Sequence, residues 1–283
     1  MPEPIGPFAE ATAVTPRPTG TAGATGAEAY DAQVGEGWDI LGNANGGYLL
    51  AIAARACTHA LGRPDPVSIT AHYLSPGTPG PVHVEVTPQR TGRRFATATA
   101  RVVDDDDRAI LTALGSFADL AGQSGPERVD ASPPELPPVE ECIVASGPPA
   151  GASSPDAPAS FMDRVDLRLH PDDAGFRDGS PSGDPRVRGW FRFPADEPVG
   201  SLGLLCVLDA FPPTVFNADL PLAWVPTLEL TAHVRRRPAP GWLSCEFTTR
   251  IVSSGFLEED GLVWDSEGHM VAQSRQLALV PRA

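Results

Sequence analysis

The chain of 283 residues contains no lysine, so each of its 21 basic side chains is an arginine. Aspartate and glutamate together number 36, which gives a formal net charge of −15. Nucleic acids and anionic membrane surfaces select proteins with a broad positive surface, and this composition does not supply one. We therefore expect neither a nucleic-acid nor a membrane partner. Any ion pair between an anionic ligand and a fixed positive side chain must involve arginine.

Long apolar runs are also missing. No stretch approaches the roughly 18 consecutive apolar residues of a membrane span, and the opening MPEPIGPFAEATAVTPRPTG lacks the basic start and apolar core of a secretory signal. These absences predict a cytoplasmic protein.

Cysteine is scarce, with four residues and no CxxC spacing, so neither a zinc site nor a disulfide framework is indicated. The acidic run Asp104 to Asp107 lacks the spacing and glycine pattern of an EF-hand and is typical of a solvated hairpin turn. We expect no metal.

Proline and glycine, by contrast, are abundant, at 32 and 28 residues. Two segments rich in small residues and proline show no periodicity. The first, residues 1–30, is expected to be an irregular N-terminal arm, and the second, residues 121–160, to be a linker. They delimit two predicted repeats, 31–120 and 161–283.

The two halves repeat at a fixed offset of 161 residues. Thr70-Ala71-His72 falls on Thr231-Ala232-His233, Pro79-Gly80 on Pro240-Gly241, Glu85 on Glu246, and Asp104 on Asp265. Several matches at one offset, each within a similar pattern, indicate a duplicated unit.

Each copy follows the same order of elements. In the first, the apolar GGYLLAIAARACTHAL predicts a buried helix, followed by strand-like runs in PVSITAHYLS, GPVHVEVTPQRTG, RFATATARVVD and RAILTALGSFADL. In the second, strands in MDRVDLRLHP and VRGWFRFP precede the expected helix LGLLCVLDAFPPTVF, and strands in PTLELTAHVRR, GWLSCEFTTRIVSS, GFLEEDGLVWDS and GHMVAQSRQLALV follow it. An antiparallel sheet with one buried face must cover it with the helix, and two such α+β units can pair edge to edge.

At this point the sequence resembles the double-hotdog acyl-CoA thioesterases, the type II medium-chain group and its relatives. The motifs are NANGGYLL, YLSPG with TGRRFATATARV, LDAFPP, PTLELTAHVRRRP and VAQSRQLALV, in that order. The resemblance implies a fold of two helices inside one continuous curved sheet. It also implies an acyl-CoA substrate, coenzyme A only as part of that substrate with no other cofactor, and assembly into a homodimer or homotetramer.

The resemblance places a catalytic triad at Asp209, at the start of the second helix, Thr227, opening the next strand, and Gln276, on the final strand. At the 161-residue offset the first copy has Tyr48, Pro66 and Gly115 in these places, so one active site per chain is expected. Thioester hydrolysis needs an oriented water, a proton acceptor and stabilisation of the oxyanion. Asp209 suits the acceptor, and the hydroxyl and amide suit the orientation of water.

Four further residues are candidate substrate contacts. Gly46 and Gly47 begin the first helix, where free N–H groups and a missing side chain favour close approach of a substrate oxygen. Arg93 and Arg94 form a local positive cluster that suits the phosphates of coenzyme A, although arginine pairs also occur on ordinary solvated surfaces.

Each triad residue has a structural alternative. For Asp209, in the apolar LCVLDAFPP, a functional role is favoured over a structural one, because an uncompensated carboxylate is costly to bury. Thr227 follows proline at an ordinary strand start, and Gln273 competes with Gln276 for the inward position on the final strand. The equivalent His72 and His233 are attributed to packing.

Other functions are weaker fits. The chain lacks the GxSxG of an α/β-hydrolase. A hotdog enoyl-CoA hydratase needs an Asp and His pair before its helix, whereas the nearest candidate, His83, falls on a strand of the other half. A non-catalytic acyl- or polyketide-binding protein remains the main alternative, because Pro212 and Pro213 must shorten or distort the second helix, a change that can misplace the Asp209 carboxylate.

Overall fold

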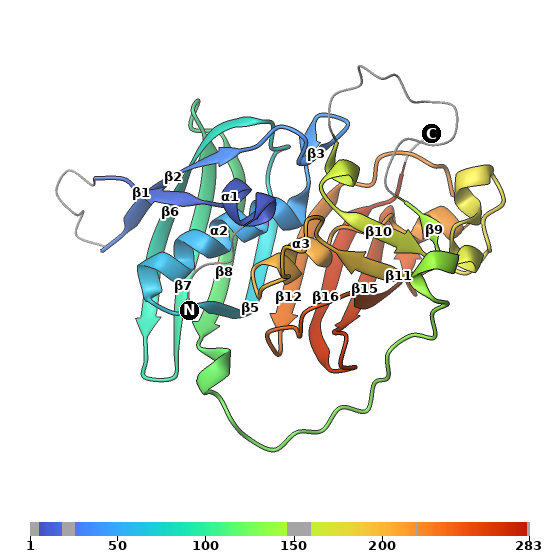
Figure 1. Cartoon of the computed structure of the whole chain (residues 1–283). Coiled ribbons are helices and arrows are strands. Elements are labelled where there is room, and N and C mark those ends of the chain that lie inside the picture. Colours follow the sequence, from blue (N-terminus) through green and yellow to red (C-terminus); the bar gives the residue numbers. More distant parts are fainter. Residues whose placement is uncertain (1–5, 19–25, 146–159, 219, 282–283) are drawn as a thin grey trace.

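The computed structural model describes residues 6–18, 26–145, 160–218 and 220–281. One antiparallel sheet of 14 strands curves around two helices (Figure 1). The first half contains β2 (Glu28–Val34), α2 (Gly46–Leu61), β5 (Asp65–Tyr73), β6 (Gly80–Thr91), β7 (Phe95–Asp104) and β8 (Ala109–Ala118). The second half contains β10 (Asp166–Leu169), β11 (Arg186–Arg192), α3 (Gly203–Val207), β12 (Thr227–Val234), β13 (Leu243–Thr248), β15 (Phe256–Trp264) and β16 (Met270–Leu279).

Shorter elements complete the chain. They are α1 (Pro7–Ala11), β1 (Val14–Pro16), β3 (Asp39–Ile40), β4 (Asn43–Ala44), β9 (Ile143–Val144) and β14 (Val252–Ser253). Six 3₁₀ helices lie at η1 (Leu120–Gly122), η2 (Val139–Glu141), η3 (Phe161–Asp163), η4 (Pro171–Asp173), η5 (Gly175–Asp178) and η6 (Thr214–Asn217) among the described residues.

The sheet has internal two-fold symmetry. Its order runs β2-β6-β7-β8-β5 and then β12-β16-β15-β13-β11, so each strand of one half has a counterpart in the other. At the junction β5 pairs antiparallel with β12, with Thr70 directly opposite Thr231 and their hydroxyl oxygens 2.9 Å apart. These two threonines are repeat-related in the sequence. The predicted duplication is thereby confirmed.

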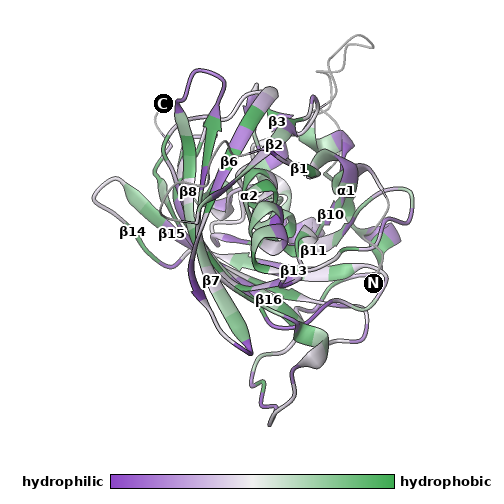
Figure 2. Ribbon diagram, turned by 90° about the vertical axis from the view of Figure 1, so that its left-hand side faces the viewer, coloured by the Kyte–Doolittle hydropathy of each residue, from purple (hydrophilic) through white to green (hydrophobic). Residues whose placement is uncertain are grey.

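The helix α2 spans the predicted residues because both of its ends are encoded locally. Asn45 is the N-cap, and its side chain accepts a hydrogen bond from the Tyr48 N–H at 2.8 Å. Gly62 ends the helix in the left-handed conformation, with φ of 57°. Figure 2 shows α2 enclosed by the curved sheet, and twelve of its sixteen residues are buried.

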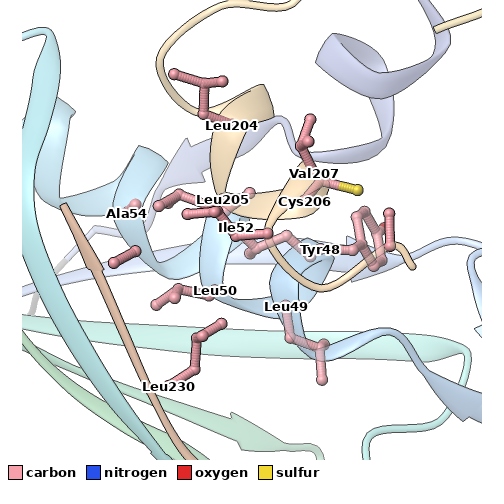
Figure 3. Packing of buried hydrophobic residues seen from close by; sticks show 14 of the residues in the cluster. Tyr48, Leu49, Leu50, Ile52, Ala54, Leu204, Leu205, Cys206, Val207 and Leu230 are labelled. Carbon is pink, nitrogen blue, oxygen red and sulfur yellow. The ribbon is translucent and has the colours of Figure 1, made fainter. Parts of the chain in front are cut away.

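The second helix is much shorter than the expected 202–216. α3 ends at Val207, and the chain continues through turns into η6. Pro212 and Pro213 have no N–H to continue a helix and their rings clash with the preceding turn, which accounts for the missing turns. The remaining turn of helix packs on α2, where Leu205 and Ile52 lie side by side (Figure 3).

The described part of the first thirty residues, 6–18 and 26–30, is not the irregular arm that the sequence predicts. The described part contains α1, β1, which pairs with β2, and the first residues of β2. Glu197 of the second half, almost fully buried, accepts hydrogen bonds from Phe8 N and Ala9 N, both at 2.9 Å, at the N-terminus of α1. Phe8 also stacks on Phe193 with ring centroids 4.6 Å apart. A carboxylate and an aromatic pair therefore fix the arm to the other half.

The expected linker is extended over 123–138 and crosses to the second half before it enters η2 and β9, which pairs with β10. The Trp190 indole N–H donates to the Pro137 carbonyl at 3.0 Å. Residues 146–159 of this segment lie outside the described part. In the described ranges, no helix is long and apolar enough to cross a membrane.

A buried carboxylate joins the halves at the end of the sheet away from Thr227. Asp65, at the start of β5, is 1% exposed and accepts hydrogen bonds from Arg237 Nε at 2.8 Å and Nη2 at 2.7 Å. Ser201 Oγ and Leu120 N donate to the same carboxylate at 2.7 and 2.9 Å. Four donors from three separate segments therefore converge on one side chain.

Replacement of Asp65 by alanine should lower the free energy of unfolding by about 2–3 kcal/mol, since it leaves three segments without their shared acceptor. Urea unfolding followed by circular dichroism measures the change. Asp130→Ala is the matched control, because the Arg128–Asp130 pair is exposed and should contribute less than about 0.5 kcal/mol. Equal effects of the two substitutions would contradict the role given to Asp65.

Candidate active site

Two of the three predicted triad residues are in direct contact. Thr227 begins β12 and Gln276 lies on the neighbouring β16, and the Thr227 hydroxyl donates to Gln276 Oε1 at 3.2 Å. Both side chains lie on the inner face of the sheet, toward the helices. Gln273, the competing candidate, is three residues away on the same strand and therefore lies on the outer face, where it pairs with His233.

Asp209 reaches the same region from the turn after α3, not from the start of a helix as expected. Its Oδ2 accepts hydrogen bonds from Gly47 N at 2.9 Å and Asn45 Nδ2 at 3.0 Å, and the Asn45 amide also donates to the Asp209 carbonyl at 2.6 Å. The carboxylate thus sits at the N-terminus of α2, which favours a negative charge. The distortion caused by the prolines does not remove Asp209 from this position.

Burial raises the pKa of Asp209 to about 6, against the opposing effect of the Gly47 and Gly46 N–H groups. Its second oxygen, Oδ1, receives no hydrogen bond from the described residues, and the side chain is only partly covered. Oδ1 is therefore free to accept a proton near neutral pH. Asp209 forms no hydrogen bond with Thr227 or Gln276 within the described structure.

A buried glutamate that sequence reasoning missed lies next to Gln276. Glu259 on β15 accepts from Gln276 Nε2 at 2.8 Å and, through its other oxygen, from Thr214 N at 2.8 Å. Burial raises its pKa to about 6, the donors from Thr214 and Gln276 lower it, and the charge of Asp209 raises it further. Because an ionised carboxylate only accepts hydrogen bonds, Glu259 fixes the Gln276 amide with its oxygen toward Thr227.

Glu259 was hidden in the acidic string Glu258-Glu259-Asp260, which is typical of a solvated surface. The alternation of side chains along a strand could have identified it, because residues two apart lie on the same face of the sheet. Glu259 lies on the same face as Leu257 and Val263, and all three are buried.

The expected contact of Gly46 and Gly47 with substrate stays a prediction, and the structure gives both glycines a packing role. Gly47 donates its N–H to Asp209, and a Cβ placed on Gly47 would lie 2.4 Å from the Leu205 carbonyl oxygen. A Cβ on Gly46 would lie 3.0 Å from both Asp209 Oδ2 and the Tyr73 hydroxyl. The glycines are required because α3 and two polar side chains approach the start of α2, and the N–H of Gly47 is already occupied.

Other candidate residues lie elsewhere. Arg93 and Arg94 are exposed in the β6–β7 turn, which register places at the opposite end of the sheet from Tyr73, so the structure gives no support to their assignment as contacts of the same substrate. The outer face holds His72 and His233 and, over the second half, a hollow of about 660 Å³.

The acidic run forms the expected turn, with Asp104 Oδ1 accepting from Asp106 N and Arg108 N at 3.1 and 2.9 Å. The four cysteines are buried free thiols. No cluster of potential metal ligands occurs within residues 6–18, 26–145, 160–218 and 220–281.

Comparison with known proteins agrees with this architecture. The family model for the acyl-CoA thioesterase N-terminal domain matches residues 34–118, and that for the acyl-CoA thioesterase C-terminal domain matches residues 139–280. An uncharacterized protein of Mycobacterium tuberculosis is 29% identical over 267 residues, which is 89% of this chain and 91% of the relative.

Solved structures show the same fold. A candidate thioesterase II from Thermobifida fusca is 31% identical, with a TM-score of 0.81 over 97% of each chain. A protein of unknown function with a hot dog fold from Alicyclobacillus acidocaldarius is 20% identical, with a TM-score of 0.78 over 98% of each chain. The predicted α+β double hotdog is confirmed.

The pKa of Asp209 has a consequence for stability. A carboxyl group whose pKa is higher in the folded than in the unfolded chain contributes stability below pH about 4, and this contribution is lost as the pH rises through about 6. Asp209→Asn keeps the shape without the charge. It should therefore be more stable than the wild type at pH 8, by on the order of 1–2 kcal/mol after allowance for partial exposure.

Thermal unfolding of both proteins at pH 5 and pH 8 measures this difference. The advantage of the variant should shrink at pH 5, where the wild-type carboxyl group is largely protonated. An advantage that is the same at both pH values, or a variant that is less stable at pH 8, would show that Asp209 is not a buried charge that opposes folding.

Proposed function

Since the chain belongs to the acyl-CoA thioesterase family, with the N- and C-terminal domains of that family in one polypeptide, we propose that it hydrolyses an acyl-CoA thioester by direct attack of water. One active site per chain is built from Asp209, Thr227 and Gln276. The reaction needs no cofactor, because coenzyme A enters as part of the substrate. Assembly as a homodimer or homotetramer remains a prediction.

In this mechanism the water lies between Asp209 and the Thr227–Gln276 pair. Oδ1 of Asp209 takes one proton as the water oxygen attacks the carbonyl carbon. Thr227 and Gln276 orient the water through their hydroxyl and amide groups, and Glu259 keeps that amide in one orientation. The carbon–sulfur bond then breaks, the proton passes from Asp209 to the thiolate, and the products are a carboxylic acid and free coenzyme A.

The observation that carries the proposal is a carboxylate with a raised pKa next to three polar side chains that are joined by hydrogen bonds. Asp209 has a pKa of about 6 and an oxygen without a donor in the described structure, and Thr227, Gln276 and Glu259 form a continuous chain of hydrogen bonds beside it. A purely structural carboxylate would not require such a chain on the facing strands. A raised pKa combined with ordered partners is typical of catalytic sites.

The non-catalytic acyl- or polyketide-binding protein remains the second candidate, for a specific reason. Asp209 caps the N-terminus of α2 through Gly47 N, and this contact alone gives the residue a structural role. The hydratase alternative has less support, because His83 pairs with Asp31 and Asp105 at the surface.

Release of free thiol from acyl-CoAs of short, medium and long chain, with branched and aromatic members, tests the proposal. Asp209→Asn should lower kcat by about 10²–10⁴-fold, because it removes the proton acceptor. Thr227→Val and Gln276→Ala should lower kcat by about 10–10²-fold through loss of water orientation.

Two substitutions serve as matched controls. Gln273→Ala changes the other glutamine of β16, on the outer face, and Asp130→Asn changes an exposed aspartate; both should retain wild-type turnover. Absence of turnover of every acyl-CoA by wild-type protein would favour the binding protein, and wild-type turnover by Asp209→Asn would exclude Asp209 as the base.

The pH dependence of kcat/KM gives a separate test. A base with a pKa of about 6 must be deprotonated to act, so activity should rise with pH, pass an inflection near 6 and reach a plateau. Because Glu259 has a similar pKa, Glu259→Gln is the control, and it should retain an inflection near 6. An inflection near 4 in the wild type would indicate a solvated carboxyl group instead.

A further inference from the structure

Tyr73 is a polar residue of the site that the proposed mechanism does not use. It is the last residue of β5, in the first half, and its hydroxyl oxygen is buried without a hydrogen-bond partner in the described structure. A buried hydroxyl without a partner is costly and needs an explanation, and a ligand that accepts its hydrogen bond is one.

The Tyr73 hydroxyl and the Asp209 carboxylate both lie next to Gly46, at the start of α2. A Cβ built on Gly46 would lie 3.0 Å from the Tyr73 oxygen and 3.0 Å from Asp209 Oδ2. In the sheet, His72 lies opposite Glu229, so continuation of the antiparallel register places Tyr73 beside the beginning of β12, where Thr227 lies. Tyr73 therefore lies close to Asp209 and near the end of the sheet that carries Thr227.

Three of the N–H donors at the start of α2 have acceptors in the protein, and a further one, that of Gly46, lies close enough to Asp209 to lower its pKa. Gly47 N donates to Asp209, Tyr48 N donates to Asn45 Oδ1, and Leu49 N donates to the Asn45 carbonyl. The oxygen of a thioester carbonyl gains negative charge as water attacks and needs a donor in place. Among the described residues around Asp209, the Tyr73 hydroxyl is a buried donor that has no protein acceptor.

We infer that Tyr73 is a further catalytic residue, whose hydroxyl donates a hydrogen bond to the thioester carbonyl oxygen of the substrate. The inference rests on the proposed function and adds the first half of the chain to an active site otherwise built from the second.

The protonation state of Tyr73 agrees with this role. Burial, followed by the charges of Asp209 and Glu229, raises the pKa of Tyr73 well above its usual value. The phenol thus stays protonated over the pH range in which Asp209 is ionised, so the donor and the base are present together.

Tyr73→Phe removes the hydroxyl and keeps the ring. We expect kcat for acyl-CoA hydrolysis to fall by about 10–10³-fold, as for the loss of other donors to a developing oxyanion, while KM changes by less than about threefold because the ground-state carbonyl gains less from the bond. The melting temperature should stay equal to that of the wild type or rise, since the removed hydroxyl has no protein partner to lose.

Tyr30→Phe is the matched control, because the Tyr30 hydroxyl donates to Glu28 at 2.6 Å on β2, away from the site. It should lower the melting temperature and leave kcat unchanged. A Tyr73→Phe variant with kcat within twofold of the wild type, or with a loss of stability like that of Tyr30→Phe, would overturn the inference.

A binding experiment separates this inference from the proposed function. Two non-hydrolysable analogues of the best acyl-CoA are compared: a ketone in which CH₂ replaces the sulfur and the carbonyl remains, and an S-alkyl thioether without the carbonyl. Calorimetry on the full chain should show that Tyr73→Phe weakens binding of the ketone by about two- to threefold, because its carbonyl resembles that of the ground state, and leaves the thioether unchanged.

Equal effects on both analogues, or no effect on either, would refute the contact with the carbonyl. Suppose instead that Tyr73→Phe weakens binding of the ketone alone, but the wild-type protein hydrolyses no acyl-CoA. This result would refute the proposed hydrolysis and still support the contact between Tyr73 and the carbonyl.

Discussion

The antiparallel pairing of β5 with β12 is the contact on which the site depends. It joins the two halves into one sheet and sets Thr70 opposite Thr231 at the centre of the repeat. Because the strands run in opposite directions, the end of β5 lies beside the start of β12. Tyr73 and Thr227 come together there, and the start of α2 faces the end of α3 above them. A shift of one of these strands by one residue would turn its side chain, Tyr73 or Thr227, to the outer face.

Within this symmetric frame the two halves differ where the chemistry is proposed. In the second half, Gln276 and Glu259 place polar groups on the inner face, and α3 stops early enough for Asp209 to reach α2. In the first half, Gly115 stands at the position equivalent to Gln276, and a Cβ there would lie 2.8 Å from the Phe117 ring. One half thus packs its inner face with apolar groups and the other leaves room for a polar chain.

The sequence predicts most of the fold because the signals for its helices and strands are local. Asn45 and Gly62 mark the ends of α2, and alternation marks the strands. The repeat at 161 residues predicts which strands are equivalent, and the family resemblance names three candidate site residues, two of which are in contact.

What the sequence does not predict depends on distant contacts. Glu259 looks like part of a solvated acidic run until its strand parity is known, and Tyr73 looks like an ordinary strand residue until Gly46 is placed next to it. The packing role of Gly46 and Gly47 is missed for the same reason. Glycine at a helix start serves either a ligand or a neighbouring backbone, and only the position of Leu205 decides between them.

The attachment of α1 through Glu197 bears on the order in which the chain folds. The two hydrogen bonds join residues 189 and 188 positions apart, so they cannot form until both halves have been synthesised and brought together. Contacts of such long range close late, after local strand and helix formation. The segment at the beginning of the chain is therefore among the last to dock, and until then Phe8 and its partner Phe193 remain accessible to chaperones or to a neighbouring molecule.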